Sequence, residues 1–410
     1  MQRYNLRNVF LEVLGLACFC AESSIAQTPD YQIIVETPYK ELSNEFSWSH
    51  PYLAAIPPAD HAGTPMVIML AQKMLKNDAG DYYSGSYELR TGDLSMTWSG
   101  PTAVPELAWV KEDGYDMALS GMVPNWHPQT AKILAIGHCA MYDQTGTYID
   151  RPGSQWVSYT VYDPQTGAWS RGQPLGQRGQ DYFGTAASCD QWLIEPDGTV
   201  LAPVYVQPSQ GARWAVAVWK CAFDGKSLSV VARGDLIARD RFRGMHEPSI
   251  TKFRGLYWLT IRANDTAFVA TSRDGLHFEP PIEWKFDDGQ PLGSQNTQQH
   301  WITHHEGLFL AYTRKTGDND DVFRNRAPLF IAQVDPDERV VLRSTERILL
   351  PNRGVPLGNF GVNHVTPYET WVSAGECMWP YHGKLPTDRG AEGAILVARI
   401  IWSNPNGDVP

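Results

Sequence analysis

Polar side chains that bind sugars or anions are concentrated in the second half of the chain, beside the ends of predicted strands. Arginine holds a carboxylate through two parallel hydrogen bonds, while amides and imidazoles bind hydroxyl groups. The group therefore indicates a site for an anionic, hydroxyl-rich ligand, unless these side chains only hydrogen-bond neighbouring strands to one another. The residues that we expect to bind substrate are Arg262, His300, Arg326, His246 and Gln299, with Asn264, Gln298 and Arg324 beside them.

Sequence motifs of several other enzyme classes are missing. The chain has no Gly-x-Ser-x-Gly elbow, no Walker loop, no dinucleotide fingerprint and no His-Glu-x-x-His. The acidic run Asp318-Asn-Asp-Asp321 lacks the spaced ligands of a known calcium loop and is predicted to be a solvated turn. We therefore expect that no cofactor is required, and a structural calcium or zinc ion stays open.

The charge balance restricts the partners. The formal net charge is −11, so the protein has no general attraction for nucleic acid. If the substrate is also anionic, a local basic pocket must oppose the field of the whole molecule. We expect an acidic polysaccharide or oligosaccharide as the partner, no membrane, and a monomer.

The N-terminus has the pattern of a secretory signal. Arg3 and Arg7 precede an apolar run over residues 9–21, and Ser24-Ile-Ala26 ends in small residues. This pattern predicts a signal peptide over residues 1–26 and a secreted or periplasmic protein. A lipid anchor on Cys18 is the less favoured alternative, because the residues before it match such a site poorly. Residues 27–410 are expected to form a single domain.

Cysteines are sparse after residue 26: Cys139, Cys189, Cys221 and Cys377. No two of them have the spacing of a zinc knuckle or a redox pair. Buried thiols are the simplest interpretation, and export would also permit a disulfide.

The elements that must position the polar residues are strands. Apolar runs of four to eight residues alternate with turns such as Pro196-Asp-Gly198, Asp224-Gly225 and Asp287-Asp-Gly289. This pattern predicts a mainly β protein. The predicted strands cover residues 66–70, 133–137, 156–162, 200–205, 214–221, 257–262, 268–272, 308–313, 329–334 and 394–401.

A weak internal repeat narrows the architecture. Three segments, 91–98, 163–169 and 272–278, combine an aspartate, a tight turn and an aromatic residue. In each, the aspartate would accept backbone N–H groups while the aromatic residue closes an outer hairpin. The repeat favours a β-propeller of seven blades, with six as the alternative, since blades take about 50–60 residues.

Three passages of the sequence resemble those of a known protein family. They are Pro124-Asn-Trp-His127 through Gly137-His138; Pro203-Val-Tyr205 with Val218-Trp-Lys220-Cys-Ala-Phe-Asp-Gly; and His246-Glu-Pro-Ser through Asn296–His300, Phe323–Arg326 and Gly358–Gly361. Together with the aspartate turns, they resemble the sialidase-like propeller superfamily, and within it ulvan lyases and enzymes that cut rhamnose–glucuronate linkages. The resemblance covers most of residues 45–400.

The resemblance implies a seven-bladed lyase that performs β-elimination beside a uronic acid. It places proton transfer on His138 and Tyr205, and carboxylate neutralisation on Lys220. His127 is a further candidate for carboxylate contact, on the ground of its residue type alone. The family usually has arginine at the position of Lys220, and lysine supplies a point charge in place of a planar fork. Each residue also has a structural alternative: a turn for His127, a core position for His138 and Tyr205, and a solvated strand for Lys220.

Two other functions stay open. The first is a hydrolase, either a rhamnosidase or a sialidase. A histidine from the first blade, here His50, is the candidate catalytic residue of a hydrolase. A sialidase would need a Phe/Tyr-Arg-Ile-Pro motif, which is missing, and an arginine cluster with a Tyr/Glu pair. The second is a propeller that binds carbohydrate without cleaving it, because one fold hosts many activities.

Overall fold

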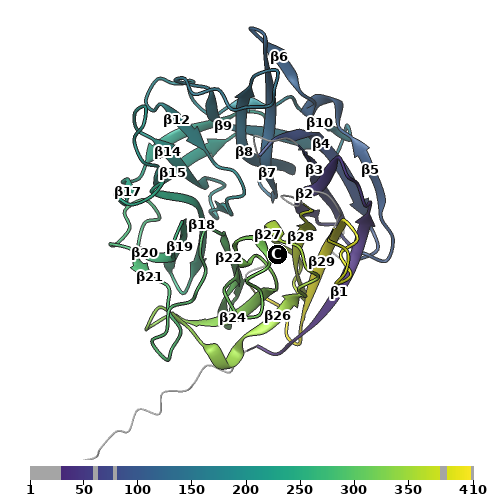
Figure 1. Ribbon diagram of the computed structural model, residues 1–410, viewed down its shortest axis with the longest axis vertical. Coiled ribbons are helices and arrows are strands. Elements are labelled where there is room, and N and C mark those ends of the chain that lie inside the picture. Colours follow the sequence, from purple (N-terminus) through teal and green to yellow (C-terminus); the bar gives the residue numbers. More distant parts are fainter. Residues whose placement is uncertain (1–28, 59–62, 77–80, 379–385, 408–410) are drawn as a thin grey trace, which may run out of the picture.

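Short strands rich in aliphatic and aromatic residues pair antiparallel and form stacked sheets. The structure is a computed structural model that describes residues 29–58, 63–76, 81–378 and 386–407. Within these residues the strands make six sheets, which are arranged as blades around a central axis (Figure 1). The all-β propeller prediction is confirmed. The predicted signal peptide, including Cys18, lies outside the described residues.

The first three blades occupy the N-terminal half of the chain. Blade 1 contains β2 (Phe46–Ile56), β3 (Met66–Leu75), β4 (Tyr83–Thr91) and β5 (Ser99–Ala103). Blade 2 contains β6 (Val110–Glu112), β7 (Tyr115–His127), β8 (Lys132–Tyr142), β9 (Gln155–Asp163), β10 (Ala168–Trp169) and β11 (Gln173–Pro174). Blade 3 contains β12 (Gly184–Ala186), β13 (Leu193–Ile194), β14 (Val200–Gln207), β15 (Ala215–Phe223), β16 (Leu228–Arg233) and β17 (Ile237–Ala238).

The last three blades complete the ring, and the N-terminal strand joins the last of them. Blade 4 contains β18 (Met245–Phe253), β19 (Leu256–Ala263), β20 (Ala267–Ser272) and β21 (Ile282–Glu283). Blade 5 contains β22 (Gln299–His304), β23 (Gly307–Thr313), β24 (Leu329–Asp335), β25 (Val340–Val341) and β26 (Arg347–Leu350). Blade 6 contains β27 (Leu357–Thr366), β28 (Glu369–Glu376), β29 (Ala394–Trp402) and β1 (Tyr31–Lys40).

Strand β1 closes the ring by pairing with β29, so that Tyr31 lies opposite Trp402. The guanidinium of Arg399 reinforces this closure, because it donates to Glu36 of β1 at 2.9 Å and to Glu369 of β28 at 2.8 Å. The described helices are the 3-10 turns η1 (Pro105–Leu107), η2 (Phe323–Asn325) and η3 (Arg343–Thr345). Within the described part of the chain, none has the length and apolarity needed to cross a bilayer.

The expectation of seven blades is wrong, and six are observed in the described residues. The reason is blade length. The innermost strands of blades 1 and 2 begin at Phe46 and Tyr115, so blade 1 is longer than the about 50–60 residues assumed for each blade. Blades 2 and 3 also carry extra short strands, which lengthen them without adding a blade.

The aspartate turns occupy the same place in three blades, after the third strand. Asp93 follows β4, Asp163 ends β9 and Asp274 follows β20. The Asp93 carboxylate accepts the backbone N–H of Thr97 at 2.9 Å, and that of Asp274 accepts the N–H of His277 at 2.9 Å. These turns fix where the outer edge of each of these blades begins.

Tryptophans fill the layers between neighbouring blades. Trp258 of blade 4 meets Trp301 of blade 5 with ring centroids 6.0 Å apart, and Trp48 of blade 1 is 1% exposed beside blade 6. Burial of such large rings supplies much of the driving force for folding. The described cysteines are thiols and not disulfides, as the simplest interpretation predicted.

Candidate functional site

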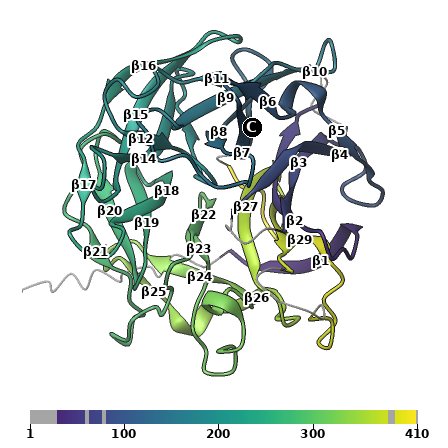
Figure 2. The same ribbon diagram turned by 45° about the horizontal axis from the view of Figure 1, so that its top comes forward.

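A β-bulge interrupts the innermost strand of four blades in its first half. The register shifts between Ser49 and Tyr52 in β2, and equivalent shifts occur in β7, β18 and β27. The bulges contain residues with positive φ, and the first strand region of blade 3 has another; these residues are His50, Gly121, Cys189, Glu247 and Asn359. Such conformations are costly for residues other than glycine and cluster at functional sites. The innermost strands surround the axis (Figures 1 and 2), so the bulges gather polar side chains there.

Gly121 shows how closely the blades approach at this level. A Cβ atom at this position would collide with Ser188 and with the backbone N of Cys189. Gly121 also has a positive φ of 59°. Both requirements select glycine, because it has no Cβ and tolerates this conformation.

His50 is held in one tautomer by Gln72 of β3. The Gln72 amide nitrogen donates to the carbonyl oxygens of Ser84 and Leu119 at 2.8 and 2.7 Å, so its oxygen must face the other way. That oxygen lies 3.1 Å from Nδ1 of His50 and can only accept a proton from it. The proton is therefore on Nδ1, and Nε2 carries the lone pair. Burial lowers the pKa of His50 to about 4, so the ring is neutral at ordinary pH.

Asn359 of β27 connects this imidazole to a cation. Its Nδ2 donates to Nε2 of His50 at 2.7 Å, and its Oδ1 accepts from Gln298 at 3.0 Å and from Nη1 of Arg326 at 3.5 Å. Arg326 is 9% exposed, and its Nε has no hydrogen-bond partner among the described residues. A neutral base and a guanidinium with an unused donor therefore flank one amide at the axis.

Glu247 and Arg262 form a buried ion pair beside Arg326. The guanidinium of Arg262 is 5% exposed and donates to Glu247 and, at 2.7 Å, to Oδ1 of Asn296. Burial raises the pKa of Glu247, but Arg262 and Arg326 outweigh it and lower the pKa to about 2. Glu247 is therefore ionised and is committed to Arg262, and Arg326 has no carboxylate partner among the described residues.

Two further arginines form the rim of this group. Arg243 is exposed and donates to Asn264 and Asn296, while Arg324 is half-buried. Burial, together with the charges of Arg326, Arg262 and Arg243, lowers the pKa of Arg324 to about 10, which shows that the four guanidinium groups share one region. We call Arg243, Arg262, Arg324 and Arg326 the arginine cluster. It makes this region positive in a protein of net charge −11.

Tyrosines border the imidazole on the other side. The ring of Tyr83 lies 4.5 Å from that of His50, and the ring of Tyr52 stacks with it at 5.7 Å. The Tyr83 hydroxyl donates to the exposed carboxylate of Asp81 at 3.2 Å. Burial raises the pKa of Tyr83 well above its usual value, and Asp81 raises it further, so the phenol stays protonated.

The structure brings several of the expected binding residues together. Arg262 and Arg326 belong to the arginine cluster, and His246 lies opposite Arg262 in the β18–β19 pair. Burial, Arg243 and Arg262 lower the pKa of His246 to about 3. Its ring nitrogens have no partner in the described part of the chain.

Two other expected binding residues make contacts within or between blades. His300 bonds through Nδ1 to Ser249 of the neighbouring blade at 2.8 Å, whereas its Nε2 has no partner among the described residues. Gln299 donates to Ser294 at 2.9 Å and to the carbonyl of Thr297, and it accepts from Thr260 at 3.2 Å. The hydrogen bonds of Gln299 therefore connect structural elements.

His138 and Tyr205 lie one strand farther from the axis than His50. His138 is in β8 opposite Ser120, is 4% exposed, and has no polar partner in the described residues. Burial and the nearby His50 lower its pKa to about 3. Tyr205 is in β14 opposite Ala186, and its ring lies 6.0 Å from that of His246. Both residues line the back of the polar region.

Lys220 and His127 lie at the opposite end of the blades. In the β14–β15 pair Tyr205 faces Val216, while Lys220 faces Leu201, four residues or about 13 Å farther along the strand. Hydrogen bonds from Thr199 lower the pKa of Asp197, which lies in the turn before β14, and the charge of Lys220 lowers it further. His127 ends β7, and its Nε2 donates to the carbonyl of Gly198 in the same turn at 2.9 Å. The structure therefore does not bring these two residues together with His138 and Tyr205.

Glu247, Asn359, Gln72 and Tyr83 were missed by sequence reasoning, and His50 was only an alternative. One sequence signal was available for two of the bulges. His50 and Glu247 each precede a proline at the start of a blade, in His-Pro and Glu-Pro. Proline restricts the residue before it, so the dipeptide marks a break in a strand.

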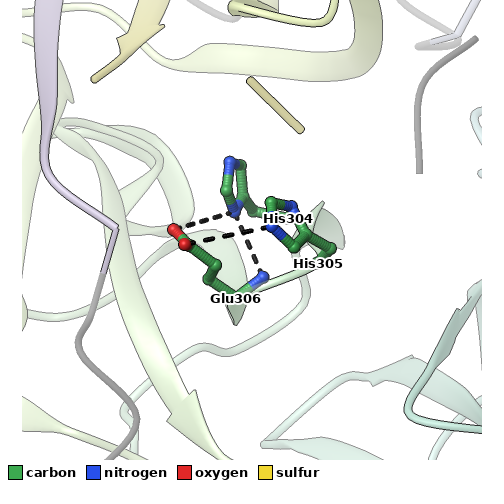
Figure 3. Close-up of side chains that lie close together, drawn as sticks. All are labelled: His304, His305 and Glu306. Carbon is green, nitrogen blue, oxygen red and sulfur yellow. Dashed lines mark hydrogen bonds and ion pairs between the residues drawn. The ribbon is translucent and has the colours of Figure 1, made fainter. Parts of the chain in front are cut away.

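A cluster that could hold a metal ion lies in the turn between β22 and β23 (Figure 3). Nδ1 of His304 accepts the N–H of Glu306 at 3.2 Å, and its Nε2 lies 3.3 Å from the carbonyl of Asn404. Nδ1 of His305 accepts the N–H of Gly407 at 3.0 Å, so its Nε2 carries the proton. Metal binding needs a lone pair on the ligand nitrogen. These imidazoles therefore do not fit a metal in the arrangement observed.

The acidic run at residues 318–321 is engaged by neighbouring groups. Asp320 pairs with Lys315 at 3.2 Å, and Asp321 pairs with Arg389 at 2.7 Å. Asp318 accepts a hydrogen bond from the Thr316 hydroxyl. These contacts suit the solvated turn that the sequence predicted.

Comparisons with known proteins identify the fold. No family model matches the chain, and no curated protein matches it in sequence. Among solved structures, Trypanosoma rangeli sialidase in complex with the inhibitor DANA is similar with a TM-score of 0.53 and 10% identity, over 89% of this chain and 59% of that chain. The α-L-arabinanase of Penicillium chrysogenum complexed with arabinobiose is similar with a TM-score of 0.52 and 10% identity, over 93% of this chain and 100% of that chain.

The chain thus has the sialidase-like β-propeller fold. It spans 59% of the length of the sialidase and the whole of the arabinanase. At 10% identity these similarities concern the fold.

Proposed function

We propose that the protein is a secreted or periplasmic polysaccharide lyase that cleaves a glycosidic bond beside a uronic acid by β-elimination. The observation that carries this proposal is the arrangement around Asn359. A neutral imidazole with its lone pair on Nε2 and the guanidinium of Arg326 contact the same amide. Elimination from a uronate needs these two groups side by side, because a base must take a proton next to a neutralised carboxylate.

The first step is binding of the uronate. The unused Nε donor of Arg326 and the positive field of the arginine cluster suit a carboxylate. Glu247 keeps Arg262 in place and prevents it from competing for the substrate. Neutralising the carboxylate stabilises the enolate-like charge that develops when the neighbouring C5–H bond breaks.

Two proton transfers, one to His50 and one from Tyr83, then complete the elimination. His50 Nε2, once the substrate replaces the Asn359 amide there, takes the C5 proton. The electron pair of the C5–H bond forms the C4–C5 double bond, and the C4–O bond breaks. Tyr83, which stays protonated and lies 4.5 Å from the His50 ring, gives a proton to the departing oxygen. The products are an unsaturated uronyl end and a new hydroxyl end. His138 and Tyr205, one strand behind, are proposed to shape this pocket.

The fold is compatible with an acidic sugar as substrate. The T. rangeli sialidase has been solved in complex with sialic acid, with a TM-score of 0.51 to this chain. Sialic acid also carries a carboxylate, and in this chain Glu247 pairs with Arg262 of the arginine cluster, beside Arg326. These features support a carboxylated sugar at the axis, whichever bond is broken.

A hydrolase is the second candidate, and one observation favours it. Burial raises the pKa of Asp190 well above its usual value, and Glu247 raises it further, while the pKa of Glu247 itself is about 2. Two carboxyl groups with pKa values pushed apart are typical of an acid and a base or nucleophile in glycosidases. The ion pair of Glu247 with Arg262 weighs against it, because it occupies the carboxylate that would have to react.

The test is incubation of the purified protein with ulvan, gum arabic and glucuronan. A lyase produces the ultraviolet absorbance of unsaturated uronates from at least one of them. Release of sugar without that absorbance would establish hydrolysis, and binding without any release would establish a carbohydrate-binding propeller.

A further inference from the structure

A cavity lies on the propeller axis at the end of the innermost strands opposite to the arginine cluster. Its volume is about 410 Å³, the size of a small-ligand pocket. All six blades contribute to it, through residues that include Ala55, Trp126, Trp192, Ile250, Thr303 and Val365. A cavity lined by every blade is a mouth of the central channel and not a surface groove.

This cavity is separate from the arginine cluster. In β2, His50 lies in the first half of the strand and Ala55 near its end, about 16 Å farther along. In β27, Asn359 lies near the start, whereas Val365 lies near the end. The arginine cluster contributes no lining residue to the cavity.

The lining differs from the arginine cluster in charge. Glu195 is the single charged residue among the described residues that line the cavity. Lys252, which does not line it, pairs with Glu195 at 3.2 Å. Burial lowers the pKa of His364, another lining residue, to about 4, so it is neutral at ordinary pH. An anionic ligand would therefore find no counter-charge in this cavity.

The lining also combines aromatic surface with small polar groups. Trp126 is half-buried and packs against the core cluster behind it, while Trp192 donates through its indole N–H to the carbonyl of Val123. Asn363 donates to Asn125 at 2.6 Å, and Thr251 and Thr303 share a hydrogen bond at 2.7 Å.

Glu195 adds an acceptor. Its Oε1 is buried and has no partner among the described residues. A buried acceptor without a partner is costly, and a ligand hydroxyl would satisfy it once the Glu195 side chain turns toward the cavity.

We propose that this cavity is a second carbohydrate site that binds a neutral saccharide of one or two units. Indole rings stack on the C–H face of a sugar ring, and amides, hydroxyls and a carboxylate oxygen take its hydroxyl groups. The lack of cations excludes the uronate proposed for the other end. The two ends of the channel therefore bind sugars of different charge.

The test is a titration of the purified full chain with rhamnose, galactose, arabinose, xylose and their disaccharides. Tryptophan fluorescence reports binding because Trp126 and Trp192 line the cavity, and saturation-transfer NMR confirms it. At least one saccharide is expected to bind saturably. Trp126→Ala should weaken that binding by about tenfold or more, because it removes the stacking surface. Glu195→Gln should weaken it less, while His50→Ala should leave it unchanged.

Two outcomes would overturn the proposal. One is that none of these saccharides binds up to its solubility limit. The other is that Trp126→Ala and Glu195→Gln both bind like the unmodified protein. Circular dichroism checks that each variant is folded. If Trp126→Ala does not fold, Asn125→Ala replaces it with the same expected loss.

Discussion

Oε1 of Gln72 lies 3.1 Å from Nδ1 of His50, and this contact decides which ring nitrogen can act as a base. Gln72 has no freedom to turn its amide, because its nitrogen already donates to two backbone carbonyls. The lone pair of His50 is therefore on Nε2, facing Asn359 of the last blade.

The activity of the unmodified protein should depend on a neutral His50. Because burial holds its pKa at about 4, the imidazole keeps its lone pair down to that pH and loses it below. We expect kcat/KM to be steady on the acid side down to about pH 4 and to fall by about tenfold per pH unit below it. A pH profile of kcat/KM checks this. An acid limb near the ordinary histidine pKa of 6.5 would contradict it.

Asn359→Asp should move that acid limb to higher pH. The new carboxylate can still accept from Gln298 and Arg326, but its second oxygen would face Nε2 of His50 at 2.7 Å. A negative charge there stabilises the imidazolium and raises the pKa of His50. The measurement is the pH profile of the variant, with Asn363→Asp, on the same strand but at the other cavity, as the control. An unshifted limb would show that Asn359 does not contact the base.

Arg326→Lys should weaken binding of the carboxylated substrate. Lysine keeps the charge but loses the planar fork, and a hydrogen bond to a charged group is worth about 1.5–3 kcal/mol, or about 10- to 100-fold in KM. Lys220→Ala is the matched control, because Lys220 lies at the other end of the blades. Steady-state kinetics compare the two variants. Equal losses, or a loss in Lys220→Ala alone, would contradict the assignment.

The protein should lose stability in mild acid because of its buried histidines. The folded-state pKa of His138 is about 3 against 6.5 for the ordinary group, so the unfolded chain binds a proton that the folded one does not. Its stabilising effect is complete above pH 6.5 and is lost, at about 1.4 kcal/mol per pH unit, as the pH falls toward 3.

His138→Leu tests that effect. Leucine is a close match in size and leaves no polar group unsatisfied, so urea midpoints of the variant should change less steeply between neutral and acid pH. His277→Asn is the control, because Asp274 raises the pKa of this exposed histidine. If His138→Leu is as acid-sensitive as the unmodified protein, His138 is not the buried neutral group described here.

Most second and third strands of the blades, though not β4 or β28, could be predicted from the sequence, but the innermost strands could not. All ten predicted strands coincide with second or third strands, such as β3, β8 and β29. These strands are buried on both faces and have the continuous apolar runs that mark them. The innermost strands contain prolines, as in β2, β7 and β18, and carry the bulges.

The candidate site was predicted in part for a related reason. Arg262 and Arg326 stand out because several cations occur close together in the sequence. Gln72 and Asn359 do not, since each is a single amide whose importance comes from a contact with another blade. Lys220 was placed by resemblance, and the register of β14 and β15 puts it at the other end of the blade.

The most direct test of the central claim measures unsaturated uronyl groups and new reducing ends together on one acidic polysaccharide. With the unmodified protein, the two should rise in equal amounts. With His50→Ala both should fall by about 100-fold or more, while the thermal midpoint stays close to that of the unmodified protein. Reducing ends without ultraviolet absorbance, or a His50→Ala variant as active as the original, would contradict the account.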